Sequence, residues 1–367
     1  MKASDDGRRP LRDLALRYTS GAGRLAAAIA ARPEAAAELT GRPNRVAVIS
    51  DGSAVPGLGD VGPAAALPFV EAKAALYAEF AGIDAVPICL DTGHARGTDG
   101  VVAAVRAIAP TFGAVDLTGF ASPSCRDIER RLRIALDVPV FHDEQHATPV
   151  VVLAALRNAL RVAGKDLHTA RIVVLGSGVT TGAVTRLLLH AGAADVTVCT
   201  PHGILDPALD TPPEPTAWLA GHTNPRRLHG GPAQALAGAD AVVAASADGQ
   251  LDQHLVDTMA APPVVFALAG PQPPASPAAV TATHLTELLA FPGIVRGLLS
   301  ARAPRITTAM LLAAADVLAG LVGEDALGPH RLLPDVVDPQ LAPTMAAAVA
   351  AVEASRRRAE PTVHKGP

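Results

Sequence analysis

The sequence is poor in aromatic residues and lacks a long run of basic residues. Aromatic side chains make up 3% of the chain and hydrophobic residues 49%, so any core must be filled mainly by Ala, Val and Leu. That composition suits helices packed on a parallel sheet. The net charge of −4 and the lack of a Lys/Arg run argue against nucleic acid as a partner, because such binding needs clustered positive charge. We expect a small-molecule ligand instead.

Cysteine and long apolar runs are also scarce. The three cysteines (Cys89, Cys125 and Cys199) form no CxxC pattern, which fits reduced thiols in a cytoplasm better than a disulfide framework. The N-terminus is polar, and no apolar run of about 18 residues is free of Gly, Pro or charge. We therefore expect a soluble cytoplasmic protein with neither a signal peptide nor a membrane span.

The 367 residues are enough for two domains with separate cores. Within residues 1–147, strand patterns such as RVAVIS (45–50) alternate with helical patterns, and a helix ending at Gly82 follows the first of them. A charged amphipathic helix then leads into a strand at Val138–Phe141. We therefore expect an N-terminal α/β domain.

Residues 148–310 predict a second α/β domain. A helix from Thr148 to about Val162 precedes four apolar, β-branched runs, RIVVL, DVTVC, DAVVAA and PVVFALA. Four such strands separated by helices or loops predict a doubly wound parallel sheet of the Rossmann type. Residues 311–367 are assigned to C-terminal helices and a frayed tail.

A glycine-rich turn lies between the first of these runs and the next helix. Gly176, Gly178 and Gly182 stand where backbone N–H groups and the helix dipole can hold a pyrophosphate. The spacing is GxGxxxG rather than the commoner GxGxxG, and a glycine pattern can also mark only a tight strand–helix junction. The pattern therefore leaves two interpretations open: a nucleotide-binding turn, or a tight strand–helix junction that binds no ligand.

The end of the DVTVC run bears on the choice of nucleotide. An NAD site usually has an acidic residue there, which accepts hydrogen bonds from the adenine ribose. This chain has Thr200-Pro201-His202 instead. Because no carboxylate would repel a 2′-phosphate and His202 could pair with one, we expect NADP rather than NAD if either binds.

Five segments follow one another in the order of one known family: RYTSGAG, the stretch from RVAVISDG to PICLDT, FHDEQHAT, GSGVTTGA and LAFPGIVRG. From about residue 8 to residue 357 the chain resembles the short, bacterial type of malic enzyme. The resemblance implies a substrate domain at the N-terminus and a cleft between two domains that binds malate, NAD or NADP, and a divalent metal. It implies oxidation at C2, loss of the β-carboxylate as CO₂ and protonation of the enolate, and it implies a homodimer.

The resemblance assigns three catalytic positions. The family's tyrosine falls on Tyr18, its lysine on Lys73, and the carboxylate that accompanies the lysine on Asp143. On this interpretation Lys73, with its pKa lowered by a closed cleft, takes a proton from a substrate hydroxyl, and Tyr18 delivers one to the enol carbon. Without the family context, Tyr18 would be read as a half-buried packing residue and Lys73 as a solvated charge.

The metal positions depart from the family pattern. Thr118 and Gly119 replace two adjacent carboxylates ahead of SPSCRDIE, where the family has APxCFEIE, and the third position holds Glu144 in place of an aspartate. A Mg²⁺ or Mn²⁺ site needs several oxygen ligands. The sequence therefore predicts no divalent metal site, unless Asp116 moves in as a substitute.

The malate-binding positions change as well. The family's ANPxPE segment reads AGPQPP at 269–274, and its pair of asparagines before LAFPG is Thr286-Glu287. Losing amide donors weakens selection for a carboxylate, and Glu287 would repel a dianion if it faced the cleft. The pattern predicts a small carboxylic acid as ligand without selecting malate.

Three functions stay open. The first is proton transfer on a small 2-oxo or 2-hydroxy acid by Tyr18, Lys73 and Asp143, as enolisation, tautomerisation or decarboxylation without metal-dependent oxidation. The second is an NAD(P)-dependent malic enzyme with substitute metal ligands. The third is a catalytically silent homologue that binds a ligand or a partner subunit. We favour the first because the acid–base residues are retained.

Overall fold

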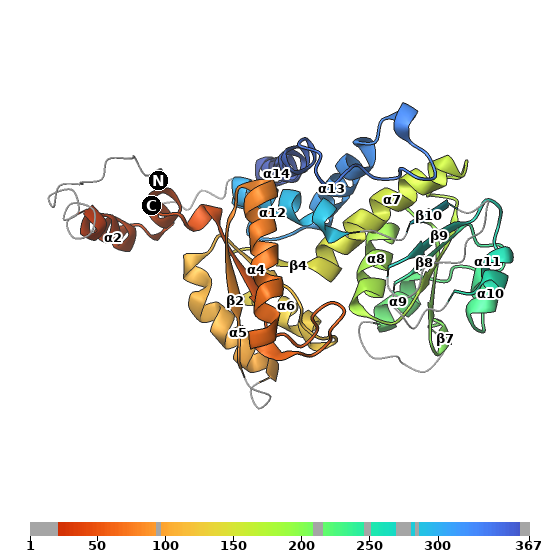
Figure 1. Ribbon diagram of the computed structural model, residues 1–367, viewed down its shortest axis with the longest axis horizontal. Coiled ribbons are helices and arrows are strands. Elements are labelled where there is room, and N and C mark those ends of the chain that lie inside the picture. Colours follow the sequence, from red (N-terminus) through yellow and green to blue (C-terminus); the bar gives the residue numbers. More distant parts are fainter. Residues whose placement is uncertain are drawn as a thin grey trace.

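The computed structural model describes residues 21–92, 97–207, 216–245, 251–268, 280–282 and 286–359. It contains two separate β-sheets, and helix α7 (Thr148–Val162) runs between them (Figure 1). This helix has the bounds expected from the sequence. Twelve of its fifteen residues are buried, because it contributes to the core on both sides.

The first sheet has the strand order β2-β1-β3-β4, and all of its strand pairs are parallel. Its strands are β1 (Arg45–Ser50), β2 (Asp84–Cys89), β3 (Ala114–Leu117) and β4 (Val140–His142). The parallel arrangement places the carboxyl ends of β1, β3 and β4 at one edge of the sheet. Side chains that follow these strands are thus brought together there.

Helices cover both faces of this sheet. Helix α4 (Gly62–Ala81) packs on one face, and α5 (Gly97–Ile108) and α6 (Ser124–Ala135) pack on the other. Helix α4 ends at Gly82, whose positive φ of 59° allows the left-handed C-cap. The expected α/β domain and the expected end of this helix are both confirmed.

The second sheet has the strand order β10-β9-β8-β5-β6-β7, with β5 as the point where the order reverses. The four expected strands are present and parallel, while the short edge strand β7 is antiparallel to β6. The strands are β5 (Arg171–Leu175), β6 (Asp195–Thr200), β7 (Gly203–Ile204), β8 (Ala241–Ala244), β9 (Val264–Ala267) and β10 (Val280–Ala282). This is the Rossmann arrangement.

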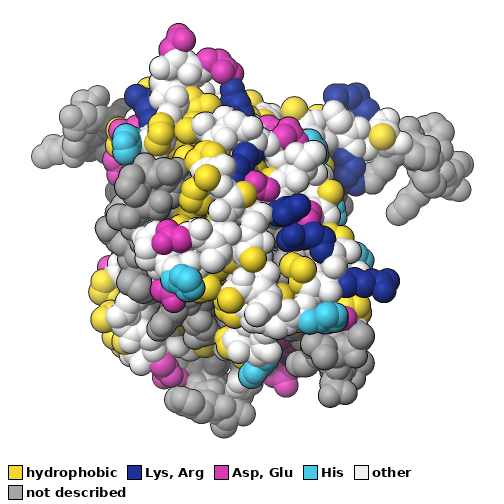
Figure 2. Space-filling model, turned by 90° about the vertical axis from the view of Figure 1, so that its right-hand side faces the viewer, with side chains coloured by type: hydrophobic (Ala, Val, Ile, Leu, Met, Phe, Trp, Pro, Cys, Tyr) yellow, Lys and Arg dark blue, Asp and Glu magenta, His cyan; other side chains and the backbone are white. Residues whose placement is uncertain are grey.

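Short and long helices surround the second sheet. Helices α7 and α8 (Val179–His190) share a core with one face, whereas α10 (Pro232–Leu236) and α11 (Gln253–Asp257) pack on the other. Helix α9 (Thr216–His222) lies against α8. Charged side chains of both signs are scattered over the end of the molecule shown in Figure 2.

The C-terminal helices return to the first sheet. Helix α12 (Phe291–Ala301) packs on α4, and α14 (Leu341–Ala359) packs on α12, while α13 (Thr308–Gly320) contacts α7 and α14. A Cβ at Gly297 would lie 2.7 Å from Val349 Cβ, so α12 and α14 approach closely because α12 carries glycine there.

At the N-terminal end, α2 (Ala22–Ala31) and α3 (Ala36–Leu39) precede the first sheet. Helix α2 extends away from the body of the molecule, and none of its ten residues is buried (Figure 1). Within the described part of the chain, no helix combines the length and apolar character needed to span a bilayer.

Candidate active site

Lys73 lies between two carboxylates at the carboxyl edge of the first sheet. Its Nζ is 2.6 Å from Asp116 Oδ2 and 2.5 Å from Asp143 Oδ2. Asp116 is on β3, and Asp143 is the first residue of the wide turn Asp143–Ala147 that follows β4. The side chains of Lys73 and Asp116 are 6% and 0% exposed, so this charge cluster is held away from solvent.

Neighbouring side chains fix the geometry of the cluster. The Tyr77 hydroxyl donates to Asp116 Oδ2 at 2.9 Å, and Thr118 Oγ1 donates to Asp143 Oδ2 at 3.2 Å. The Tyr77 ring packs edge-on against Phe291 of α12, with centroids 4.8 Å apart. The same Phe291 ring lies 5.2 Å from Lys73 Nζ, close enough for a cation–π contact.

The expectation that Lys73 titrates below a free lysine is wrong. Burial lowers the pKa of Lys73, but the adjacent Asp116 and Asp143 outweigh burial and raise the pKa above its ordinary value. Lys73 is therefore an ammonium group at neutral pH. Burial raises the pKa of Asp116 to about 6 although Lys73 opposes the shift, so Asp116 can gain or lose a proton near neutral pH.

Of the three predicted acid–base residues, the structure brings Lys73 and Asp143 together. Tyr18 lies outside the described residues. Asp116, considered from the sequence only as a substitute metal ligand, instead holds Lys73 and Tyr77. The sequence did contain a signal for this pairing. Asp116 is a charged residue in the otherwise apolar strand AVDL, and a buried charge needs a partner.

Two further carboxyl groups, Glu144 and Glu287, interact electrostatically with Asp143. Burial raises the pKa of Glu144, and Asp143 and Glu287 raise it further. Burial also raises the pKa of Glu287, with a second contribution from Asp143. Glu287 is thus electrostatically coupled to Asp143, and its repulsion of a bound dianion stays a prediction. The segment 269–274 lies outside the described residues.

The residues present do not fit the divalent metal that the family resemblance implies. Thr118 uses its hydroxyl on Asp143, and Gly119 has a φ of 66° with a Cβ position only 2.9 Å from Ser50 Oγ. An aspartate at 119 would therefore be strained and crowded. Over the described ranges, no three His, Cys, Asp or Glu side chains converge as ligands.

The glycine-rich turn lies where β5 passes into α8, at the reversal point of the second sheet. Gly176 has a φ of 131°, and its N–H donates to Cys199 O at 2.9 Å, which ties the turn to β6. Gly178 is the N-cap of α8, with open space beside its Cα. Gly182 lies inside α8 rather than in the turn. Gly176 and Gly178 therefore leave the N-terminus of α8 accessible to a phosphate.

Thr200 and His202 form the tight turn between β6 and β7. Thr200 Oγ1 donates to Gly203 O at 3.2 Å and accepts from the His202 N–H at 3.2 Å. The buried hydroxyl is thus used within the turn, whereas His202 is exposed. Of these two residues, His202 is the one placed to reach a 2′-phosphate.

A Rossmann sheet with an open glycine turn stands beside a second parallel sheet whose edge holds a buried lysine–carboxylate cluster. This combination is typical of enzymes that use a nucleotide cofactor beside an acid–base site. Residues 12–133 match the family described as Malic enzyme, N-terminal domain, and residues 285–354 match Malic enzyme, NAD binding domain.

Whole-chain relatives support the same assignment. The NAD-dependent malic enzyme of Geobacillus stearothermophilus is 42% identical, covering 94% of this chain and 74% of its own length. The bifunctional malic/malolactic enzyme of Bacillus subtilis is 38% identical, with 93% and 86% covered. The NAD-dependent malic enzyme structure from Thermotoga maritima superposes with a TM-score of 0.86 at 35% identity, covering 95% of each chain. This chain belongs to the malic enzyme family.

Proposed function

We propose that this protein catalyses proton transfer on a small 2-oxo or 2-hydroxy acid, by enolisation, tautomerisation or decarboxylation. The observation that carries the proposal is the buried Lys73 between Asp116 and Asp143. A desolvated ammonium group stabilises a developing enolate oxygen more strongly than it would in water. Lys73 thus acts as a cation and proton donor toward oxygen, rather than as the neutral base expected from the sequence.

The other groups have distinct parts in this reaction. Asp143 orients Lys73, and Asp116 can hold the transferred proton because its pKa is raised to about 6 by burial. By family resemblance Tyr18 exchanges the proton at carbon. Gly176 and Gly178 would hold the pyrophosphate of NADP or NAD, which would supply a hydride acceptor in the oxidative candidate described next and has no part in the proton transfer itself.

Oxidative decarboxylation of malate is the second candidate. It is favoured by the relatives, which are named as NAD-dependent or bifunctional malic enzymes. It requires metal ligands other than Thr118 and Gly119.

The family resemblance also predicts a homodimer in either case, which light scattering on the purified protein would test.

The two candidates are separated by assays on one preparation. Oxaloacetate decarboxylation and deuterium exchange into pyruvate, followed by NMR after EDTA treatment and without nucleotide, should proceed under the first proposal. Reduction of NADP⁺ or NAD⁺ that depends on malate and Mn²⁺, with no metal-free exchange, would replace it by the second. If neither reaction occurs, the chain is a binding homologue and both candidates fail.

A further inference from the structure

Phe291 brings the second family segment into contact with the Lys73 cluster. It is the first residue of α12 and is 4% exposed. Lys73 Nζ lies over its ring, 5.2 Å from the centroid, and the Tyr77 ring meets it edge-on at a centroid distance of 4.8 Å. Phe291 belongs to the matched residues 285–354, whereas Lys73 and Tyr77 belong to 12–133. Through this ring the C-terminal helices contact the cation of the candidate site.

Close contacts fix the position of α12. A Cβ at Gly293 would lie 2.8 Å from Met345 Cβ, so α12 and α14 approach this closely because glycine stands there. Nearly one turn further along α12, Arg296 Nη1 donates to Asn44 Oδ1 at 2.6 Å, which ties the helix to the segment just ahead of β1. The ring at the start of this helix therefore has little freedom to move.

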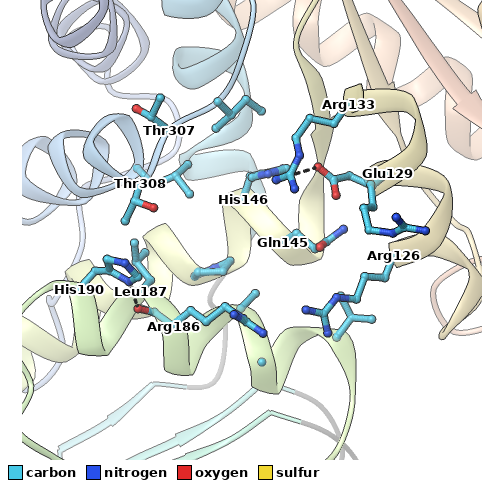
Figure 3. Close-up of a pocket in the computed structure, with 17 residues that line it drawn as sticks. Arg126, Glu129, Arg133, Gln145, His146, Arg186, Leu187, His190, Thr307 and Thr308 are labelled. Atoms are coloured by element: carbon cyan, nitrogen blue, oxygen red, sulfur yellow. Dashed lines mark hydrogen bonds and ion pairs between the residues drawn. The ribbon is translucent and has the colours of Figure 1, made fainter. Parts of the chain in front are cut away.

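The two carboxylate partners of Lys73 are less constant than this ring. The Asp143 side chain is 17% exposed and begins the wide turn. Gln145 and His146 of that turn line a groove of about 380 Å³ between α6 and α8 (Figure 3), so the turn is open on one side. Asp116 is the group proposed above to hold the transferred proton, and its neutral form attracts an ammonium group less strongly than its carboxylate form.

We propose that Phe291 is a positioning residue that holds the Lys73 ammonium group through the face of its ring. The negative face of an aromatic ring attracts a cation, and the attraction strengthens when both groups are out of water, as they are here. A phenyl ring does not titrate, so this contact persists while Asp116 gains and loses a proton. The effect on turnover rests on the proposed proton transfer, whereas the contact itself does not.

A ring that serves only as a packing surface behaves differently from a ring that holds a cation. Packing depends on the shape of the ring, whereas attraction of a cation depends on the charge distribution over its face. Fluorine in place of ring hydrogens weakens the negative face and changes the shape little. Mono-, tri- and pentafluorinated phenylalanine incorporated at position 291 therefore separate the two roles.

Deuterium exchange into pyruvate measures the effect on turnover. kcat should fall stepwise with added fluorine, by about 3- to 10-fold for the pentafluorinated ring, with little change in KM. The matched control is the same replacement at Phe80, a half-buried ring on α4 over which the described part of the chain places no cation. The control should turn over as the parent does. An equal loss at both positions, or no loss at 291, overturns the proposal.

Urea unfolding tests the contact without any turnover. The pentafluorinated ring at 291 should raise the unfolding equilibrium constant by about 3- to 10-fold in the parent chain but not in Lys73→Met, where the cation is absent. If Lys73→Met does not fold, Lys73→Met/Asp116→Asn provides the background without the cation. An effect that depends on Lys73 supports the contact even in a parent that shows no exchange, where the proposed function alone fails. The same effect with and without Lys73 assigns the ring to packing and overturns the proposal.

Discussion

The Nζ of Lys73 and the Oδ2 of Asp116 are 2.6 Å apart in a position where neither side chain is more than 6% exposed. Removing both charges from water is costly, and their attraction offsets that cost only while both partners are present. The free energy of unfolding of the protein and the protonation state of Asp116 therefore depend on each other.

Substitution of the cation should show this dependence. Lys73→Met leaves Asp116 and Asp143 without their common partner, and we expect a loss of about 3–5 kcal/mol in the free energy of unfolding at pH 8. At pH 5 the loss should be smaller, because protonated Asp116 no longer needs the cation. Urea unfolding of the parent and of Lys73→Met at both pH values measures this difference in the free energy of unfolding. The double variant Lys73→Met/Asp116→Asn should recover part of the free energy of unfolding at pH 8. A double variant no more stable than Lys73→Met would show that the two charges do not stabilise each other as a buried pair.

Asp116 should also give the folded protein a characteristic pH dependence. Its pKa is raised by burial from 3.8 to about 6, so the folded chain binds this proton more tightly than the unfolded chain. The corresponding stabilisation is present below about pH 4 and is lost as the pH rises to about 6. Asp116→Asn should remove this component from unfolding curves between pH 4 and 7. Asp84→Asn, at an exposed position on β2, is the control and should leave the slope unchanged.

Turnover should depend on both proposed proton-transfer residues. Lys73→Ala and Tyr18→Phe are each expected to lower turnover by roughly 10²–10⁴-fold, and the double variant by less than the product of the two effects. Ligand binding should survive in Tyr18→Phe. Solvent-deuterium exchange into a bound 2-oxo acid is the measurement, and exchange as fast in both variants as in the parent would refute the assignment.

NADP(H) should bind more tightly than NAD(H), if either binds. His202 is exposed beside the end of β6, and His202→Ala should weaken NADP⁺ by roughly 3- to 10-fold without changing NAD⁺. Titration calorimetry with both nucleotides compares them directly. Tighter NAD⁺ binding in the parent protein would contradict this interpretation of the strand end.

Removal of divalent ions should leave the proton-transfer activity largely unchanged. The reason is the donor set, since Thr118 and Gly119 offer no carboxylate and Asp143 Oδ2 already accepts from Lys73 and Thr118. Activity before and after dialysis against EDTA is the test. A tight Mn²⁺ site that includes Glu144, detected by calorimetry, would show the prediction to be wrong.

Local features of the fold were predictable because they depend on neighbouring residues. The end of α4 at Gly82 follows from a glycine that accepts positive φ, and α7 begins and ends at Thr148 and Val162 as its apolar pattern indicates. The two-residue antiparallel strand β7 was not predicted, because so short a strand leaves no periodic pattern.

The candidate site was only partly predictable. Family motifs identified Lys73 and Asp143, but the partnership of Lys73 with Asp116 depends on the order of strands in the first sheet, which no local pattern specifies. The raised pKa of Lys73 was missed for the same reason, since it needs the second carboxylate. The contact between Tyr77 and Phe291 joins segments far apart in sequence and likewise required the structure.

The packing of α12 on α4 has a consequence for synthesis of the chain. The aromatic contact between Tyr77 and Phe291, and the close approach of α12 to α14, cover α4 with residues that are translated after the strands of the second sheet. A nascent chain that has emerged only as far as α7 lacks this cover and exposes the apolar side of α4. We therefore expect the N-terminal half to finish folding only after α12 and α14 are made, when Phe291 reaches Tyr77 and Lys73.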